Sequence, residues 1–143
     1  MGEAREVMDR ATAAMMAKDP EAAAVCYAAD AVATTPDEGE ISGREAISKY
    51  LVQLIEAFPD VGYEYVQQHE SGLVAIDEGY VIGTNTGPLL MPSGESLPAT
   101  GKQIRVRSCD VANVEGGLIT THRFYFDQME FLGQLGLLPD MPS

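Results

Sequence analysis

The spacing of apolar residues changes once along the chain, near Val61, and this change limits the folds that the sequence can adopt. Before Val61, apolar residues recur every three to four positions, which is the period of an amphipathic helix. After it, they alternate with polar residues, as in strands that bury one face. Helices followed by a run of strands predict an α+β fold, with the helices packed on one face of a curved antiparallel sheet. The 143 residues show no repeat or linker, so we expect one domain over residues 1–143.

The first half of the chain is expected to form three helices and one short strand. The expected helices are Glu3–Ala17, Pro20 to about Ala28, and Ser42 to Phe58. Ser42 and Glu45 have the spacing of a capping box, so Ser42 is the expected cap of the third helix. The short strand is expected at Ala31–Thr35, before a turn-rich segment that contains Pro36 and Gly39.

The second half is expected to form two hairpins. The expected strands are Tyr63–His69, Leu73–Thr86, Lys102–Val114 and Leu118–Phe126. If a three-residue loop pairs Val114 with Leu118, then Asp110 lies directly opposite His122. The other residues on their face are mostly apolar: Val106, Ser108, Ala112, Phe124 and Phe126. We therefore expect this face to be concave and covered by the helices.

The opposite face of this hairpin is polar and suits either solvent or a subunit interface. Its residues are Arg105, Arg107, Thr121, Arg123, Tyr125 and Asp127. Because the protein has a net charge of −13, these arginines could pair with acidic residues of a second subunit. The sequence is thus compatible with two alternatives, a homodimer through this face or a solvated face.

Two sets of acidic groups are candidates for catalysis. A carboxylate and an imidazole on an apolar wall, as expected for Asp110 and His122, can act as general acid or base. The same pair could instead form a purely structural buried hydrogen bond. Asp127 is a second candidate acid, although Asp127 and Glu130 also have capping-box spacing at the start of a last helix.

Composition excludes several classes of partner and cofactor. The net charge of −13 disfavours nucleic acid and anionic membrane surfaces, and no apolar run is long enough to span a bilayer. Two cysteines, Cys26 and Cys109, make no disulfide framework and suit a reducing compartment, so we expect a cytoplasmic protein. The cysteines, His69 and His122 lack metal-ligand spacing, and no nucleotide fingerprint is present. We therefore expect no metal and no cofactor.

Several short segments together resemble a known family. They are Tyr27–Val32, Gly43–Ile47, Phe58–Asp60, Gly83–Gly87, Thr100–Lys102, and Tyr125–Asp127 with Gln134–Gly136. In this order they are similar to the SnoaL-like polyketide cyclases of the nuclear transport factor 2-like superfamily. The resemblance covers nearly the whole chain. It implies a cone-shaped sheet around three helices, an internal ligand pocket and often a homodimer, but no single reaction.

The sequence departs from the enzymes of this superfamily at three positions. Thr35 stands where ketosteroid isomerases carry their catalytic acid, and Ala11 stands where they carry a tyrosine. Phe124 stands at the acid position of limonene epoxide hydrolases. Of the isomerase residues compared, only the oxyanion-stabilising acid has a match in this sequence, which is Asp110.

We therefore expect an enzyme of cyclase, isomerase or related lyase type. It would use cofactor-independent acid/base catalysis on a small apolar carbonyl compound in an enclosed pocket, through Asp110 and His122, with Asp127 in reserve. The alternative is a non-catalytic ligand-binding or accessory domain with the same fold. Expected pocket residues are Met15, Tyr27, Tyr50, Leu54, Ser108, Phe124 and Phe126.

Overall fold

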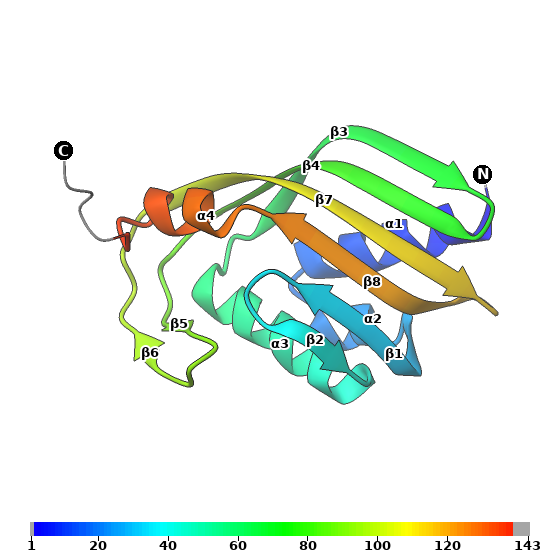
Figure 1. Cartoon of the computed structure of the whole chain (residues 1–143), viewed down its shortest axis with the longest axis horizontal. Helices are drawn as coiled ribbons and strands as arrows, with labels where there is room; N and C mark the ends of the chain where they lie inside the picture. Colours follow the sequence, from blue (N-terminus) through cyan, green and yellow to red (C-terminus); the bar gives the residue numbers. More distant parts are fainter. Residues whose placement is uncertain (1, 139–143) are drawn as a thin grey trace.

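The computed structural model describes residues 2–138, which form a curved six-stranded sheet with helices against its concave face (Figure 1). The helices are α1 (Glu3–Met16), α2 (Pro20–Ala24), α3 (Arg44–Ala57) and α4 (Gln128–Gln134). The strands of the sheet are β1 (Tyr27–Thr35), β2 (Gly39–Ser42), β3 (Gly62–Ser71), β4 (Val74–Thr84), β7 (Gln103–Glu115) and β8 (Leu118–Phe126), in the order β2-β1-β8-β7-β4-β3. A small hairpin, β5 (Leu89–Leu90) and β6 (Ser96–Leu97), stands apart. The predicted α+β fold class is confirmed.

The second helix is shorter than the sequence predicts, and the first strand is longer. α2 ends at Ala24, and β1 begins at Tyr27, within the expected helix. β1 lies inside the sheet, parallel to β8 and antiparallel to β2. Pairing on both edges overrides the helical preference of the alanines in this segment, because tertiary contacts outweigh local propensity.

The expected cap of the third helix is also wrong. Ser42 belongs to β2, a strand that the sequence did not predict. The N-cap of α3 is Gly43, with φ of 95° and no side-chain capping bond. The chain turns sharply from β2 into α3 at this residue, and a positive φ of this kind favours glycine.

Helices and sheet enclose two apolar clusters. The larger one joins α1, α2 and α3 to the sheet, and its largest fully buried members include Met8, Val114 and Ile119. The smaller one surrounds Phe58 and Leu135 near α4. Burying a large apolar side chain contributes roughly 1.5–3 kcal/mol, so these clusters hold the helices on the sheet.

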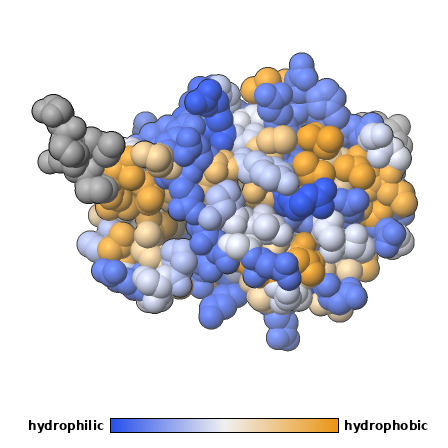
Figure 2. All heavy atoms as spheres, viewed as in Figure 1, coloured by the Kyte–Doolittle hydropathy of each residue, from blue (hydrophilic) through white to orange (hydrophobic). Residues whose placement is uncertain are grey.

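No helix of residues 2–138 is long and apolar enough to cross a membrane. On the face shown in Figure 2, apolar side chains gather over α4, which buries none of its own residues.

The β7–β8 hairpin has the predicted inward face but a different register. Its loop contains two residues, Gly116 and Gly117, both with positive φ, so Glu115 pairs with Leu118. A bulge at Thr120 then adds one residue to β8. As a result Asp110 lies opposite Phe124, and His122 lies opposite Ala112, so the predicted direct opposition of Asp110 and His122 is wrong. Both side chains still point to the concave side, where they are buried.

The start of α1 is capped by a residue from β3. The Glu70 carboxylate accepts hydrogen bonds from the backbone N–H groups of Gly2 and Arg5, both at 2.9 Å. These bonds, that of Arg5 first, lower the pKa of Glu70. A carboxylate at a helix N-terminus also interacts favourably with the helix dipole.

Because the folded protein lowers the pKa of Glu70, this group stabilises the fold above the ordinary glutamate pKa and loses that contribution as the pH falls. We expect Glu70→Gln to be less stable than the wild type at pH 7, with the difference shrinking on acidification below about pH 4. Urea unfolding across this pH range measures it. Glu40→Gln, at an exposed position of β2, is the matched control and should run parallel to the wild type. An unchanged difference at low pH would contradict the capping role.

Candidate functional site

A cavity of about 120 Å³ lies between α1, α3 and the concave face of the sheet. Most of its lining is apolar, with contributions from Ala11, Met15, Leu51, Leu54, Val61, Val81 and Phe124. The polar groups are few and come mainly from neighbouring strands: Tyr27, Tyr63, Asp77, Ser108, Asp110 and His122. Such a pattern, an apolar cavity with a few converging polar groups, is typical of ligand sites.

His122 joins two of these polar groups into a chain of hydrogen bonds. Its Nδ1 lies 2.7 Å from the Tyr27 hydroxyl, and its Nε2 lies 2.6 Å from Oδ2 of Asp110. The ring also stacks on Phe124, with 4.0 Å between centroids. β1, β7 and β8 each supply one member of the chain, so the central strands of the sheet fix its geometry.

The hydrogen bonds allow a consistent placement of protons along these three residues. The Tyr27 hydroxyl has one hydrogen-bond partner among the described residues, Nδ1 of His122. When the hydroxyl donates to Nδ1, the ring proton lies on Nε2 and is donated to Asp110. Burial, and then the negative charge of Asp110, raises the pKa of Tyr27, so the phenol keeps its proton.

Both ring nitrogens of His122 are engaged, so the imidazole itself has no free atom for a ligand. Oδ1 of Asp110 has no hydrogen-bond partner within residues 2–138, and Asp110 lines the cavity. The arrangement therefore leaves one carboxylate oxygen of Asp110 without a hydrogen-bond partner among the described residues, while His122 contacts the other oxygen.

A second carboxylate stands beside Asp110, and the sequence interpretation missed it. Asp77 on β4 is the direct partner of Asp110 on β7, and its side chain is only 2% exposed. Burial, and then the charge of Asp110, raises the pKa of Asp77, while Arg5 opposes this rise. The signal was present, because Asp77 alternates with buried Ala75 and Gly79 along β4. Extending the face argument to the first hairpin would have found it.

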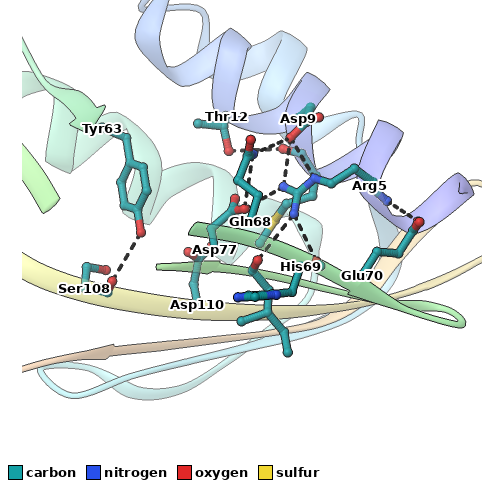
Figure 3. A network of polar contacts seen from close by, with 12 residues as sticks. Arg5, Asp9, Thr12, Tyr63, Gln68, His69, Glu70, Asp77, Ser108 and Asp110 are labelled. Atoms are coloured by element: carbon teal, nitrogen blue, oxygen red, sulfur yellow. Dashed lines mark hydrogen bonds and ion pairs between the residues drawn. The ribbon is translucent and has the colours of Figure 1, made fainter. Parts of the chain in front are cut away.

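Arg5 of α1 balances the charge of Asp77 (Figure 3). Its guanidinium lies 2.6 Å from Asp77 and 2.8 Å from Asp9, and it donates to the carbonyl oxygens of His69 and Ile76. Like charges on facing strand positions are unfavourable. Arg5 on one side and His122 on the other give each carboxylate its own hydrogen-bond donor.

Tyr63 closes the wall on the β3 side. Its hydroxyl donates to the Ser108 carbonyl at 3.2 Å, as Figure 3 shows. Its ring lies against Gly79, where an added Cβ would sit 2.8 Å from Tyr63 Cε1 and 2.0 Å from the Glu64 carbonyl oxygen. Only glycine fits at this position of β4, because any side chain would displace the backbone of β3.

A second cavity, of about 160 Å³, continues toward α4. It shares five lining residues with the first: Leu51, Leu54, Val81, Ser108 and Phe124. Asp37, Glu38 and Tyr50 also line this second cavity, and the Tyr50 hydroxyl donates to Asp37 Oδ1 at 3.1 Å. Apart from Gln53 and Ser108 the remaining wall is apolar, and it includes Leu89 of β5 and Phe131 of α4.

The structure brings the seven predicted pocket residues to these cavities. Met15 and Tyr27 line the first, Tyr50 and Phe126 line the second, and Leu54, Ser108 and Phe124 line both. That they touch a ligand stays a prediction.

Asp127 lies elsewhere. Its Oδ1 accepts from the backbone N–H groups of Met129 and Glu130 at 2.8 and 3.3 Å, so it caps α4, and it lines neither cavity. The Glu130 carboxylate does not complete a capping box, since it accepts instead from the Arg107 backbone N–H.

The remaining candidates of the sequence analysis are dispersed. Cys26 is buried, Cys109 is half-buried, and His69 is exposed on β3. Within the described residues, no group of three His, Cys, Asp or Glu side chains is arranged to hold a metal ion.

Comparison with protein families gives one match. The model of the SnoaL-like domain matches residues 8–122, most of the chain. The chain belongs to the SnoaL-like family. The predicted resemblance is thereby confirmed. A comparison of this SnoaL-like protein with curated proteins gives no match.

Solved structures similar to this SnoaL-like protein carry diverse names. A protein assigned as a SnoaL-like polyketide cyclase from Jannaschia sp. CCS1 has a TM-score of 0.82 and 14% identity, with 96% of this chain and 94% of that chain covered. AclR from Streptomyces galilaeus, assigned as a hydroxylase, has a TM-score of 0.80 and 20% identity, with 99% and 85% covered. A protein with a ketosteroid isomerase-like fold from Catenulispora acidiphila DSM 44928, in complex with trimethylamine, has a TM-score of 0.77 and 21% identity, with 96% and 98% covered. At these identities the similarity shows a shared fold and assigns no activity.

Proposed function

We propose that this SnoaL-like protein is a cofactor-independent acid/base enzyme that acts on a small, largely apolar carbonyl compound, with Asp110 as its general base. The observation that carries the proposal is the Tyr27–His122–Asp110 chain, with bonds of 2.7 and 2.6 Å, on the wall of an apolar cavity. A buried carboxylate held by one hydrogen bond, with its other oxygen toward a ligand, suits proton transfer from carbon.

The reaction step follows from these positions. Asp110 Oδ1 takes a proton from the carbon next to the carbonyl group, and the C–H electron pair moves to form the enolate. In this proposal the Ser108 side chain, two residues before Asp110 on the same face of β7 and in the lining of the cavity, donates a hydrogen bond to the enolate oxygen. His122 keeps the second oxygen of Asp110 in place, and Tyr27 fixes the tautomer of His122.

The second candidate function is ligand binding without turnover. It is favoured by Thr35, Ala11 and Phe124, which stand where related enzymes carry acids and a phenol. The trimethylamine in the structure from Catenulispora acidiphila is a small ligand bound by a protein of the same fold. A binding domain would use the same cavity, with the Asp110–His122 bond serving to fix the register of β7 and β8.

Hydrogen–deuterium exchange separates the two functions without knowledge of the natural substrate. Apolar ketones such as tetralone and octanone are incubated with the protein in D₂O, and deuterium next to the carbonyl group is followed by NMR. We expect exchange faster than in buffer alone, and no acceleration with Asp110→Asn. Binding of the ketones without accelerated exchange in the wild type would instead establish the binding domain.

The predicted homodimer and cytoplasmic location stay predictions. On the outer face, Arg105 lies 2.8 Å from Glu64, and Arg107 lies 3.6 Å from Glu130. These arginines are engaged within the chain, so a dimer through this face would depend more on Tyr125, which is 53% exposed. Sedimentation of Tyr125→Ser beside the wild type tests this contact.

A further inference from the structure

We infer that the two cavities form one site for an elongated apolar molecule that carries no anionic group and directs a hydrogen-bond donor, as a hydroxyl or an ammonium group, at Asp37. The inference deepens the proposed function and rests on it in one respect, namely that the reacting end of the ligand lies at Asp110. It concerns affinity, so it can be tested without turnover.

The first step is the continuity of the site. Five residues line both cavities, so the cavities are adjacent and at most this one layer of side chains lies between them. Either cavity alone, at about 120 or 160 Å³, is below the usual range of roughly 300–1,000 Å³ for ligand sites. A molecule that reaches Asp110 and fills both would therefore be longer than it is wide.

The second step is the charge of the lining. Asp77 and Asp110 line the first cavity, and Asp37 and Glu38 line the second. Neither cavity is lined by a lysine or arginine of the described residues. An anionic ligand would lose its hydration and meet four carboxyl groups with no lysine or arginine of the described residues to pair with, which disfavours carboxylates, phosphates and sulfates as ligands.

The third step is a hydrogen-bond acceptor in the wall of the second cavity. The Tyr50 hydroxyl donates to both oxygens of Asp37, at 3.1 and 3.4 Å, and so fixes the half-buried carboxylate at the cavity wall. Burial, and then Asp37 itself, raises the pKa of Tyr50, so the phenol remains the donor. Carboxylate oxygens accept more than one hydrogen bond, and Asp37 thus keeps capacity for a donor on the ligand.

Three probes with one apolar body and different ends test the inference: naphthylethylamine, naphthylethanol and naphthylacetate. Their affinities are measured by calorimetry with the wild type, Asp37→Asn and the control Glu40→Gln, an exposed acid outside both cavities. With the wild type we expect the acetate to bind at least about tenfold more weakly than the other two. Asp37→Asn should weaken the amine by about tenfold while changing the alcohol little, and Glu40→Gln should change neither.

Acetate binding equal to that of the amine, or failure of all three probes to bind at millimolar concentration, would overturn the inference. So would an amine affinity that is the same in Asp37→Asn and the wild type. These outcomes are independent of the exchange assay. Asp110→Asn should abolish exchange and keep the order of probe affinities, whereas a binding domain would show that order with no exchange at all.

Discussion

Asp110→Asn will lower the rate of proton transfer by about 10²–10⁴-fold, the usual contribution of a positioned general base. The amide cannot take a proton from carbon at neutral pH. Its oxygen can still accept from Nε2–H of His122, so the buried chain to Tyr27 keeps its hydrogen bonds. The rate of deuterium exchange into a ketone measures the loss, and thermal unfolding should show a nearly unchanged midpoint.

Two further variants test the positioning of His122 and the choice between Asp110 and Asp127. Tyr27→Phe removes the hydroxyl that contacts Nδ1 of His122, so it should lower the rate because the ring is misplaced, while the base is kept. Its pH profile should keep the wild-type shape, since Asp110 is still present. Asp127→Asn changes the cap of α4, outside both cavities. If Asp127→Asn removed exchange while Asp110→Asn did not, the assignment of the base would be wrong.

Arg5→Met will cost about 3–5 kcal/mol of the free energy of unfolding, the usual effect of removing one partner from a buried ion pair. The Arg5 and Asp77 side chains are 6% and 2% exposed, so water cannot replace the lost guanidinium. Without it, Asp77 stays buried opposite the second carboxylate, Asp110. Urea unfolding at pH 7 measures the loss.

The pH dependence of this loss follows from the sign of the pKa shift. Arg5 lowers the pKa of Asp77, so its removal makes Asp77 harder to ionise in the folded protein. The deficit of Arg5→Met should be largest at neutral pH and should shrink as acidification protonates Asp77. The double variant Arg5→Met with Asp77→Asn should recover part of the stability at pH 7. If Arg5→Met alone were as stable as the wild type, the Arg5–Asp77 ion pair would make no net contribution to stability.

The sequence predicted the inward face of the β7–β8 hairpin because alternation has a period of two and the predicted register differs from the observed one by two positions. It could not predict the pairs themselves, because they depend on a two-residue loop and on the bulge at Thr120. It also missed β2, which is too short to show a period and forms because β1 offers it an edge.

The candidate site was predicted in part for a similar reason. Asp110 and His122 share one hairpin, so local spacing brings them together. Tyr27 and Arg5 reach the site from β1 and α1, whose positions on the sheet are set by tertiary packing. In the sequence Arg5 and Asp9 have the spacing of an exposed ion pair on a helix surface, so nothing there links Arg5 to Asp77.

The loop and the bulge of the β7–β8 hairpin compensate for one another. A two-residue loop with a bulge at Thr120 presents the same inward residues as a three-residue loop without a bulge. The reason is that the pairing of β8 with β7 differs between the two arrangements by two positions, an even number. During divergence, a residue can therefore move between the tip and the strand without turning His122 outward. In an alignment of related hairpins, the gap would then fall in either of these two places, although the cavity wall that the hairpin forms stays the same.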